Sequence, residues 1–219
     1  MALNNPYALS LSSGSYIDVD VAGLAIDDPD LGDFTIEGWI YIRGGQYLFS
    51  TGAQTSDVGM VILYNQPYIS VKTRTDNFEI RDSNLFKINE WHHFALVWER
   101  DKKEARYYIN GELGAIIPRV GSGFSKSGRT FIRINAPDNN TAYYGNAIYD
   151  ELRIWSVVRT QEEIQRFMNT LISPTTPNLE RLIRFDDNSG NVTCLVTRNT
   201  YKINGTYSWV GGEVNLSSY

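Results

Sequence analysis

Apolar and polar positions follow a β-strand pattern most clearly over residues 91–113, which read WHHFALVWERDKKEARYYINGEL. Two apolar, aromatic-rich runs flank a charged tip at residues 99–104. Aromatic and β-branched residues fit a half-buried pleated surface while clustered charges stay in water, so the pattern predicts a β-hairpin. Asn110 and Gly111 predict a second reversal, because both tolerate the positive φ angles of a type I′ turn. We therefore expect a meander of antiparallel strands here.

Short apolar runs separated by glycine, asparagine or proline continue along the rest of the chain. Residues 34–42 alternate so that Ile36 and Ile40 share one face and Trp39 and Tyr41 share the other. Both faces carry apolar bulk, which predicts an interior strand covered on its outer side. Further strands are expected at 7–11, 16–21, 46–50, 58–64, 68–73, 78–81, 131–134 and 148–155. This spacing, without long helical patterns, favours an antiparallel sandwich over a parallel sheet.

One helical pattern is convincing, over residues 160–171. Thr160 and Glu163 have the spacing of a capping box, in which each side chain bonds a free backbone amide. Pro174 and Pro177 then end the helix. The apolar stripe of this helix, which we assign to core packing, comprises Ile164, Phe167, Met168 and Leu171.

The tail, residues 178–219, allows two arrangements. It could return along the sandwich and pair with outer strands, or it could be half of a second unit. The second arrangement would leave the apolar residues of 182–185 exposed. We expect the first, with residues 1–219 forming a single domain and the tail packing back on the sandwich.

Three segments of the chain carry a resemblance to a known family. They are DFTIEGWI at residues 33–40, the hairpin that opens with Trp-His-His at 91–93, and IYDELRIW at 148–155 followed by a short helix. In this order they resemble laminin-G-like and pentraxin-like domains of the concanavalin A-like lectin and glucanase superfamily, most closely the bacterial type. The resemblance covers roughly residues 7–170. It implies an all-β, antiparallel jelly-roll β-sandwich with one short helix near residues 160–171.

The resemblance also implies an extracellular or cell-surface location. The first residues lack the basic start and apolar core of a signal peptide, which leaves a cytoplasmic location open. The chain contains no apolar run of about 20 residues, which a membrane-spanning helix would need. Its 20 basic residues are outnumbered by 25 acidic ones, so a basic surface is not indicated. Membrane insertion and nucleic-acid binding are therefore not expected. The single cysteine, Cys194, cannot form an intramolecular disulfide. We expect Cys194 to be buried and to pack as a small apolar side chain.

Catalytic constellations are not evident in the sequence. Glucanases of this fold place acidic residues at alternate positions of one strand, in the pattern Glu-x-Asp-x-x-Glu, and this chain lacks that pattern. The nearest candidates, Asp150 and Glu151, are adjacent and should point to opposite faces of a strand, where they could not flank one glycosidic bond. We expect both to bond loop amides or Arg153 instead. The chain is interpreted as non-enzymatic.

Calcium is the metal that the family resemblance implies, bound at the rim of the sandwich. Asp57, ahead of a strand, resembles one ligand, and Asp138 with the neighbouring Asn139 and Asn140 could supply others. Carboxylate, amide and backbone oxygens are the ligands that calcium takes. The alternative is that these are ordinary turn residues, which favour local hydrogen bonds.

The same rim offers the best candidate for an organic ligand. Tyr143 and Tyr144 lie beside Asn139 and Asn140 in the chain. Sugars stack a C–H face on aromatic rings while amides meet their hydroxyls, so this combination favours glycan binding.

Three functions follow, in order of preference. The first is a carbohydrate-binding, lectin-like module assisted by calcium. The second is a protein-interaction or adhesion module, including a receptor-binding part of a larger secreted protein or toxin. The third is a glycan-active enzyme. The oligomeric state and the identity of the ligand are not predicted.

Overall fold

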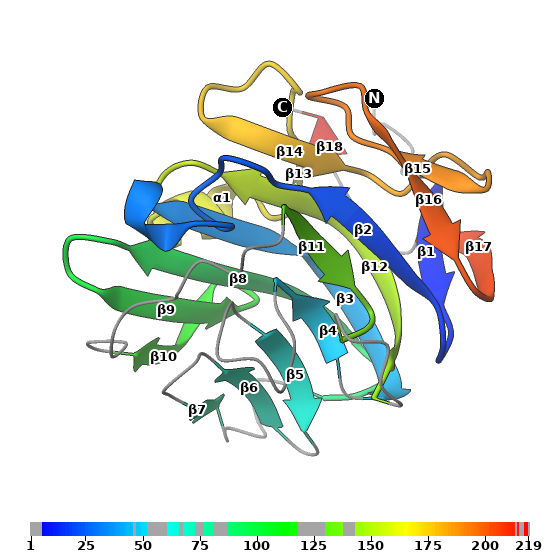
Figure 1. Cartoon of the computed structure of the whole chain (residues 1–219), viewed down its shortest axis with the longest axis horizontal. Coiled ribbons are helices and arrows are strands. Elements are labelled where there is room, and N and C mark those ends of the chain that lie inside the picture. The colour runs from blue at the N-terminus through cyan, green and yellow to red at the C-terminus, as the bar shows by residue number, and fades with distance from the viewer. Residues whose placement is uncertain are drawn as a thin grey trace.

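The computed structural model describes residues 6–45, 47–51, 61–65, 68–72, 77–80, 87–117, 130–137, 143–212, 214 and 217–218. Within these residues the chain forms two antiparallel β-sheets packed face to face, with the hydrophobic core between them (Figure 1). The prediction of an antiparallel all-β sandwich with one short helix is confirmed. A short 3₁₀ turn at Pro29–Leu31 precedes the first long strand.

Sheet I contains the predicted hairpin and the longest strands. Its order is β10 (Glu112–Ile117), β9 (Glu104–Ile109), β8 (Trp91–Glu99), β3 (Phe34–Gly45), β12 (Gly145–Trp155), β1 (Tyr7–Leu11) and β17 (Tyr207–Gly211), and β14 (Leu179–Ile183) also pairs with β12. Asn110 and Gly111 have φ angles of 52° and 78°, as the expected tight turn between β9 and β10 requires.

Sheet II consists of shorter strands. Its order is β15 (Asn191–Thr193), β16 (Thr200–Asn204), β2 (Tyr16–Asp20), β11 (Phe131–Ile134), β4 (Tyr47–Ser50), β5 (Val61–Asn65), β6 (Tyr68–Lys72) and β7 (Asn77–Ile80). The tail therefore returns to both layers: β14 and β17 join sheet I, and β15 and β16 join sheet II. Cys194, between β15 and β16, is a free cysteine with no exposed surface, as predicted.

Aromatic rings from both sheets meet at the centre of the core. Phe49 of β4 packs against Phe94 of β8 with 4.9 Å between ring centroids, and against Tyr149 of β12 at 5.6 Å. All three rings are buried. Burial of one such side chain contributes about 1.5–3 kcal/mol, so this contact is a main attachment between the two sheets.

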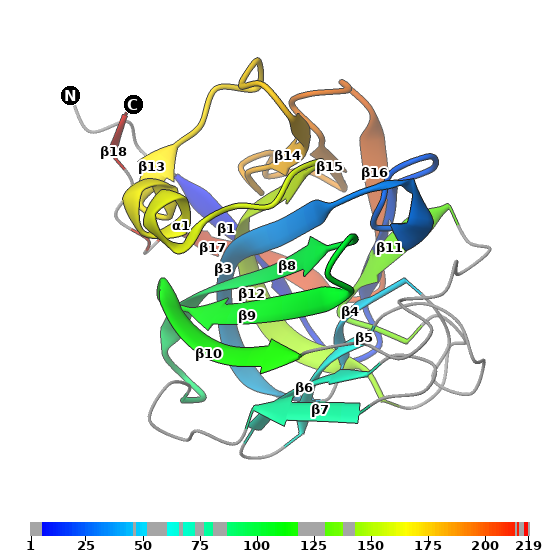
Figure 2. The same cartoon turned by 90° about the vertical axis from the view of Figure 1, so that its left-hand side faces the viewer.

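Helix α1 (Gln161–Phe167) lies on the outer side of sheet I, beside the short strand β13 (Figure 2). Ile164 is fully buried and packs against Ala95, Val97 and Tyr108. The predicted helical span of 160–171 is too long at its C-terminal end. Residues Thr170–Leu171 form β13, which pairs in parallel with β18 (Ser217–Ser218). The helix ends where it does because Arg153 takes the carbonyl of Phe167, which a longer helix would use internally.

A β-bulge interrupts strand β12. The register shifts between Asp150 and Arg153, and Glu151 has a φ of 49°. Tyr149 and Leu152 both face the core, so the extra residue breaks the simple alternation. The prediction that Asp150 and Glu151 point to opposite faces is therefore wrong. Arg153 donates a hydrogen bond to Glu151 on the outer side of sheet I. The expectation that Glu151 bonds Arg153 in a structural role is confirmed.

Gly38 of β3 makes room for this bulge. A Cβ atom at Gly38 would lie 3.2 Å from the carbonyl oxygen of Asp150 and 3.2 Å from Cα of Leu152. The two backbones thus approach more closely than a side chain would allow.

Candidate functional site

The rim residues predicted from the sequence fall largely outside the described residues. Asp57, Asp138, Asn139 and Asn140 all do so, and the calcium site stays a prediction. Tyr143 is described, with 46% of its surface exposed. Its carbonyl oxygen accepts a hydrogen bond from the backbone N–H of Tyr47 at 3.3 Å, which attaches this part of the rim to β4. The neighbouring Tyr144 is half-buried.

The strand register separates the attachment points of the two predicted rim segments. Residues 52–60 follow Ser50 and Thr51, at the end of β4 that pairs with Arg133 and Val61. Residues 138–142 precede Tyr143, which contacts the opposite end of β4 at Tyr47. The two segments therefore leave the sheet at opposite ends of β4.

Asn135 holds the base of the rim at Tyr143. Its side-chain amide donates to the carbonyls of Ser12 and Ser15, at 3.1 and 2.9 Å, and its Oδ1 accepts from the Tyr149 hydroxyl at 3.1 Å. Its backbone also pairs with Leu48 and Gly145. This role was not predicted, and its one signal in the sequence is that asparagine tolerates the positive φ of 70° found here.

A cavity of about 290 Å³ lies between α1, the end of β12 and the loop after β13. Its lining residues are Trp155, Arg159, Phe167, Ile172, Ser173, Thr175, Thr176 and Pro177. The volume is near the lower end of small-molecule sites, which begin at roughly 300 Å³. Aromatic and aliphatic walls thus meet hydroxyl groups and one guanidinium in a single concave site, which we call the α1 cavity.

Arg159 is held in the α1 cavity by its backbone and by its aromatic neighbours. Its N–H donates to the hydroxyl of Thr35, which itself donates to the carbonyl of Val157. The guanidinium carbon lies 4.3 Å from the centre of the Trp155 ring and 5.3 Å from that of Phe167. Cation–π attraction therefore keeps a positive charge at an apolar wall.

The hydrogen-bonding capacity of Arg159 is largely unused. The side chain is 9% exposed, its Nε has no partner, and both polar contacts of the guanidinium, to the carbonyl and the carboxylate of Glu163, are 3.5 Å long. Normal N–H···O bonds are about 2.7–3.2 Å. The other buried arginines, Arg133, Arg153 and Arg181, each make a contact of 2.7–2.8 Å. Among the buried arginines of the described chain, Arg159 alone lacks such a contact.

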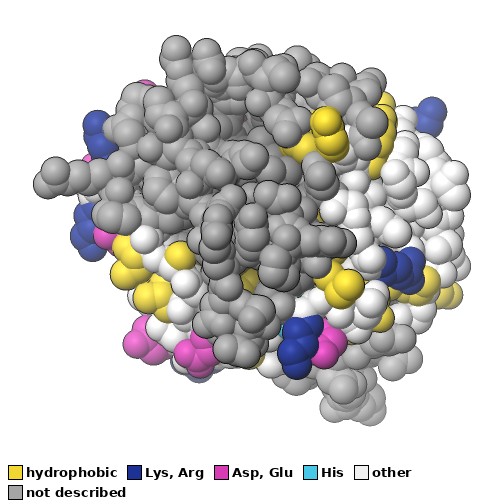
Figure 3. All heavy atoms as spheres, turned by 90° about the horizontal axis from the view of Figure 1, so that it is seen from below, with side chains coloured by type: hydrophobic (Ala, Val, Ile, Leu, Met, Phe, Trp, Pro, Cys, Tyr) yellow, Lys and Arg dark blue, Asp and Glu magenta, His cyan; other side chains and the backbone are white. Residues whose placement is uncertain are grey.

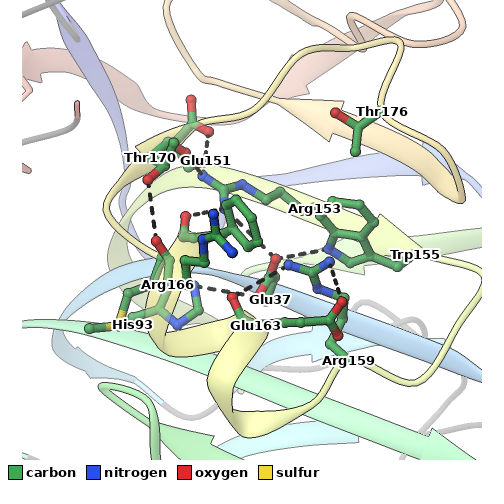
Figure 4. A network of polar contacts seen from close by, with 12 residues as sticks. Glu37, His93, Glu151, Arg153, Trp155, Arg159, Glu163, Arg166, Thr170 and Thr176 are labelled. Carbon is green, nitrogen blue, oxygen red and sulfur yellow. Dashed lines mark hydrogen bonds and ion pairs between the residues drawn. The ribbon is translucent and has the colours of Figure 1, made fainter. Parts of the chain in front are cut away.

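Beneath the α1 cavity lies a network of buried charges (Figure 4). Arg153 donates to Glu151 at 3.0 Å and to the carbonyls of Phe167 and Thr170 at 2.9 and 2.7 Å. The indole N–H of Trp155 donates to Oε1 of Glu37 at 2.8 Å. These side chains are at most 1% exposed. The network attaches α1 and β13 to sheet I, and it fixes the floor of the cavity rather than facing solvent.

His93 borders this network but forms no ion pair with it. Its Nε2 lies 3.8 Å from Oε2 of Glu37. Burial, reinforced by the positive charge of Arg153, holds the pKa of His93 well below its usual value. The imidazole is therefore neutral, and the distance to Glu37 does not represent a salt bridge.

A second, more polar cavity of about 270 Å³ lies at the other end of β14. It is lined by Arg184, Asp186, Asp187, Thr193 and Leu195. Burial raises the pKa of Asp186 to about 6, against the opposing effect of its hydrogen bond from the Tyr7 N–H. Asp187 accepts hydrogen bonds from the backbone and hydroxyl of Thr193. Both carboxylates thus already have partners within the fold.

The described residues form no basic patch on the face shown in Figure 3. On the face shown in Figure 3, basic and acidic side chains of the described residues are interspersed. No group of three or more histidine, cysteine or acidic residues that could hold a metal occurs in the part of the chain that is described. Within that part, no helix has the length and apolar character needed to cross a membrane.

Residues 11–165 match the family model of the concanavalin A-like lectin/glucanase superfamily, laminin-G type. The chain belongs to this family. The match covers more than half of the chain and includes each segment that carried the resemblance. No curated protein sequence is significantly similar to the chain.

Solved structures confirm the fold. A candidate carbohydrate-binding protein from Bacteroides ovatus is 19% identical with a TM-score of 0.77, covering 98% of this chain and 62% of that protein. The SAP-like pentraxin of Limulus polyphemus is 13% identical with a TM-score of 0.63, covering 96% and 97%. The CBM40 of the Ruminococcus gnavus IT-sialidase, solved with α2,3-sialyllactose, is 12% identical with a TM-score of 0.52, covering 72% and 100%. This chain thus spans less than two thirds of the Bacteroides protein.

Proposed function

We propose that this chain is a non-catalytic carbohydrate-binding module and that the α1 cavity is its principal binding site. The observation that carries this proposal is the lining of the cavity. Trp155, Phe167 and Pro177 supply apolar walls, while Ser173 and Thr175 supply hydroxyl groups. A sugar presents C–H faces and hydroxyls together, and this lining matches both. Structural relatives that are named as carbohydrate-binding support the same function.

The carboxylates support a binding role rather than glycoside hydrolysis. Hydrolysis needs two carboxyl groups that flank an accessible bond. Glu37 and Glu151 are buried and bonded to Trp155 and Arg153, so neither meets a ligand in the α1 cavity. The acid pair at Asp186 and Asp187 is adjacent in sequence and is engaged by Tyr7 and Thr193.

Calcium at the rim is a second part of the proposal. Asp57 and Asp138 are the proposed ligands, with Asn139, Asn140, Tyr143 and Tyr144 as glycan contacts. The residue types and the family support this assignment. Because the two segments leave β4 at opposite ends, each aspartate is tested separately. The family membership also supports a location outside the cell or at its surface, which fractionation of the source cells would test.

A protein ligand is the alternative function, and one feature favours it. Strand β10 is an edge of sheet I and exposes Leu113 and Ile116, at 40% and 51%. Edge strands with exposed apolar side chains are common sites of protein contact.

A glycan array probed with the whole chain, in calcium and in chelator, tests the proposed function. We expect binding to a restricted set of glycans, weakened when Thr175→Trp narrows the α1 cavity. A chain that binds no glycan, but captures a protein whose binding free sugars do not compete, would overturn the proposal in favour of the alternative.

A further inference from the structure

The α1 cavity contains one charged side chain whose hydrogen-bonding capacity the described residues leave largely unused. Among the described lining residues, Arg159 is the single ionisable group, and the rest are apolar or carry hydroxyls. A guanidinium has five N–H donors, and removing it from water without partners is costly. The Arg159 side chain is nevertheless only 9% exposed, with an unpartnered Nε and only 3.5 Å contacts to Glu163.

Glu163 is not a dedicated partner for Arg159. Its Oε2 accepts the backbone N–H of Thr160 at 2.9 Å, as the capping box requires. Its side chain is 43% exposed, so water screens the charge that it presents to Arg159. The remaining neighbours of the guanidinium are the rings of Trp155 and Phe167, which attract a cation but accept no strong hydrogen bond.

We propose that the α1 cavity binds an anionic sugar, with a carboxylate or sulfate group paired to Arg159 and the sugar hydroxyls facing Ser173, Thr175 and Thr176. This rests on the proposed function and specifies its ligand class. The carboxylate or sulfate oxygens would accept hydrogen bonds from the guanidinium N–H groups of Arg159. Such charge-assisted hydrogen bonds are strong in a site of low polarity. The apolar walls account for the C–H face of the same sugar.

The hydroxyl rim has acceptor and donor capacity left for such a ligand. Ser173 and Thr175 share one hydrogen bond of 2.8 Å between their hydroxyls, and Thr176 donates to the carbonyl of Ser173 at 2.8 Å. Each hydroxyl can make further bonds, because it has one donor and two acceptor positions. Figure 4 labels three of the lining residues. Trp155 ends β12, Arg159 precedes α1, and Thr176 follows β13.

The experiment compares glycans that differ only by the charged group. Calorimetric titrations would pair lactose 3′-sulfate with lactose, 3′-sialyllactose with its methyl ester, and trigalacturonate with its methyl ester. We expect at least one anionic probe to bind the whole chain about tenfold or more tightly than its neutral partner, equivalent to about 1.4 kcal/mol. Affinity should fall as salt is raised, because the contact is electrostatic.

Variants then locate the contact. Arg159→Gln should lower the affinity for the anionic probe to that for its neutral partner, and Arg159→Lys should restore part of it. Arg166→Gln is the matched control: Arg166 is an exposed arginine of α1, the helix that follows Arg159, and it does not line the cavity, so its loss should change affinity less than about twofold. Thr175→Trp narrows the cavity without altering Arg159, and should weaken binding even if Arg159→Gln fails to fold.

The outcomes separate this inference from the proposed function. Equal affinity for anionic and neutral probes, or full anion preference in Arg159→Gln, would overturn the inference while leaving carbohydrate binding in place. Preference for an anionic probe that Arg166→Gln abolishes and Thr175→Trp leaves unchanged would also overturn it. Absence of binding to every glycan on the array would overturn both.

Discussion

The indole N–H of Trp155 donates a 2.8 Å hydrogen bond to Oε1 of Glu37, linking β12 to β3 on the outer side of sheet I. Both side chains are 1% exposed, and Arg153 lies 3.8 Å from the same oxygen. Replacing a buried carboxylate with these partners should strongly lower the stability of the fold.

Glu37→Ala should reduce the free energy of unfolding by about 3–5 kcal/mol, because it leaves the buried Arg153 without one of its counter-charges and Trp155 without its acceptor. Glu37→Gln should cost less, since its amide oxygen can still accept from Trp155. Urea denaturation of the three proteins gives the comparison. Equal stability of Glu37→Ala and the parent chain would show that the network contributes nothing.

Acid should destabilise the protein through His93. Its folded-state pKa lies well below 6.5, so below pH 6.5 the unfolded state binds a proton that the folded state does not. This contribution to stability is present above pH 6.5 and is lost on acidification, at up to about 1.4 kcal/mol per pH unit. The groups facing the imidazole are Glu37 and Arg153. His93→Gln should show a shallower fall in unfolding free energy between pH 6.5 and 5, and an unchanged slope would contradict the assignment.

Asp186 should have the opposite pH dependence. Burial raises its pKa from 3.8 to about 6, so the folded state holds a proton more tightly than the unfolded state. The resulting stability is full below pH 3.8 and is lost as pH rises through 6. Asp186→Asn, which keeps an acceptor for the Tyr7 N–H, should be more stable than the parent at pH 7.5 and converge with it near pH 4. Asp101→Asn, at an exposed carboxylate of the β8–β9 turn that does not act on Asp186, is the control and should show no gain.

Thr160→Ala should destabilise α1 by about 1 kcal/mol, because the N–H of Glu163 loses its acceptor at the helix start. Thr160→Ser, which restores a hydroxyl, should recover most of this loss. Thermal unfolding followed by circular dichroism measures both. If the alanine variant unfolds at the parent temperature, the capping box has no measurable role.

Calcium binding at the rim should appear as a saturable heat on titration with calcium chloride, abolished by a chelator. Asp57→Asn and Asp138→Asn should each weaken it, because each removes a charged oxygen ligand. Asp187→Asn, near the second cavity, should leave it unchanged. Loss in only one of the two variants would place the ion on one rim segment.

Local chemistry was sufficient to predict much of the fold. The hairpin of 91–113 depends on a charged tip and an Asn-Gly turn, and both act within a few residues of chain. The bulge in β12 was not predictable, because Glu151, which has the positive φ, pairs not only with its neighbour Arg153 but also with Arg184, which follows β14 in a remote part of the chain. The helix end at Phe167 has the same origin, since a distant arginine takes its carbonyl.

The α1 cavity was missed for a related reason. Its residues all fall between 155 and 177, but Phe167 was assigned to an apolar helical stripe, and no motif in the sequence singled out Arg159. That Arg159 is buried and poorly bonded depends on Thr35, Trp155 and Phe167 surrounding it. Such a condition has no signature in one sequence. The rim tyrosines were proposed from the sequence because their neighbours in the chain are polar, and their role stays a prediction.

The bulge at Glu151 lets β12 carry one residue more than its partner β3 while both halves of the strand stay in register, with Asp150 opposite Trp39 and Arg153 opposite Glu37. Deleting Glu151 would therefore keep Tyr149 and Leu152 on the core face, but it would remove the buried carboxylate that pairs with Arg153 and Arg184. A deletion at this one position should thus act on the protein mainly through the lost charge, whereas a one-residue deletion elsewhere in the strand would turn half of its side chains to the other face.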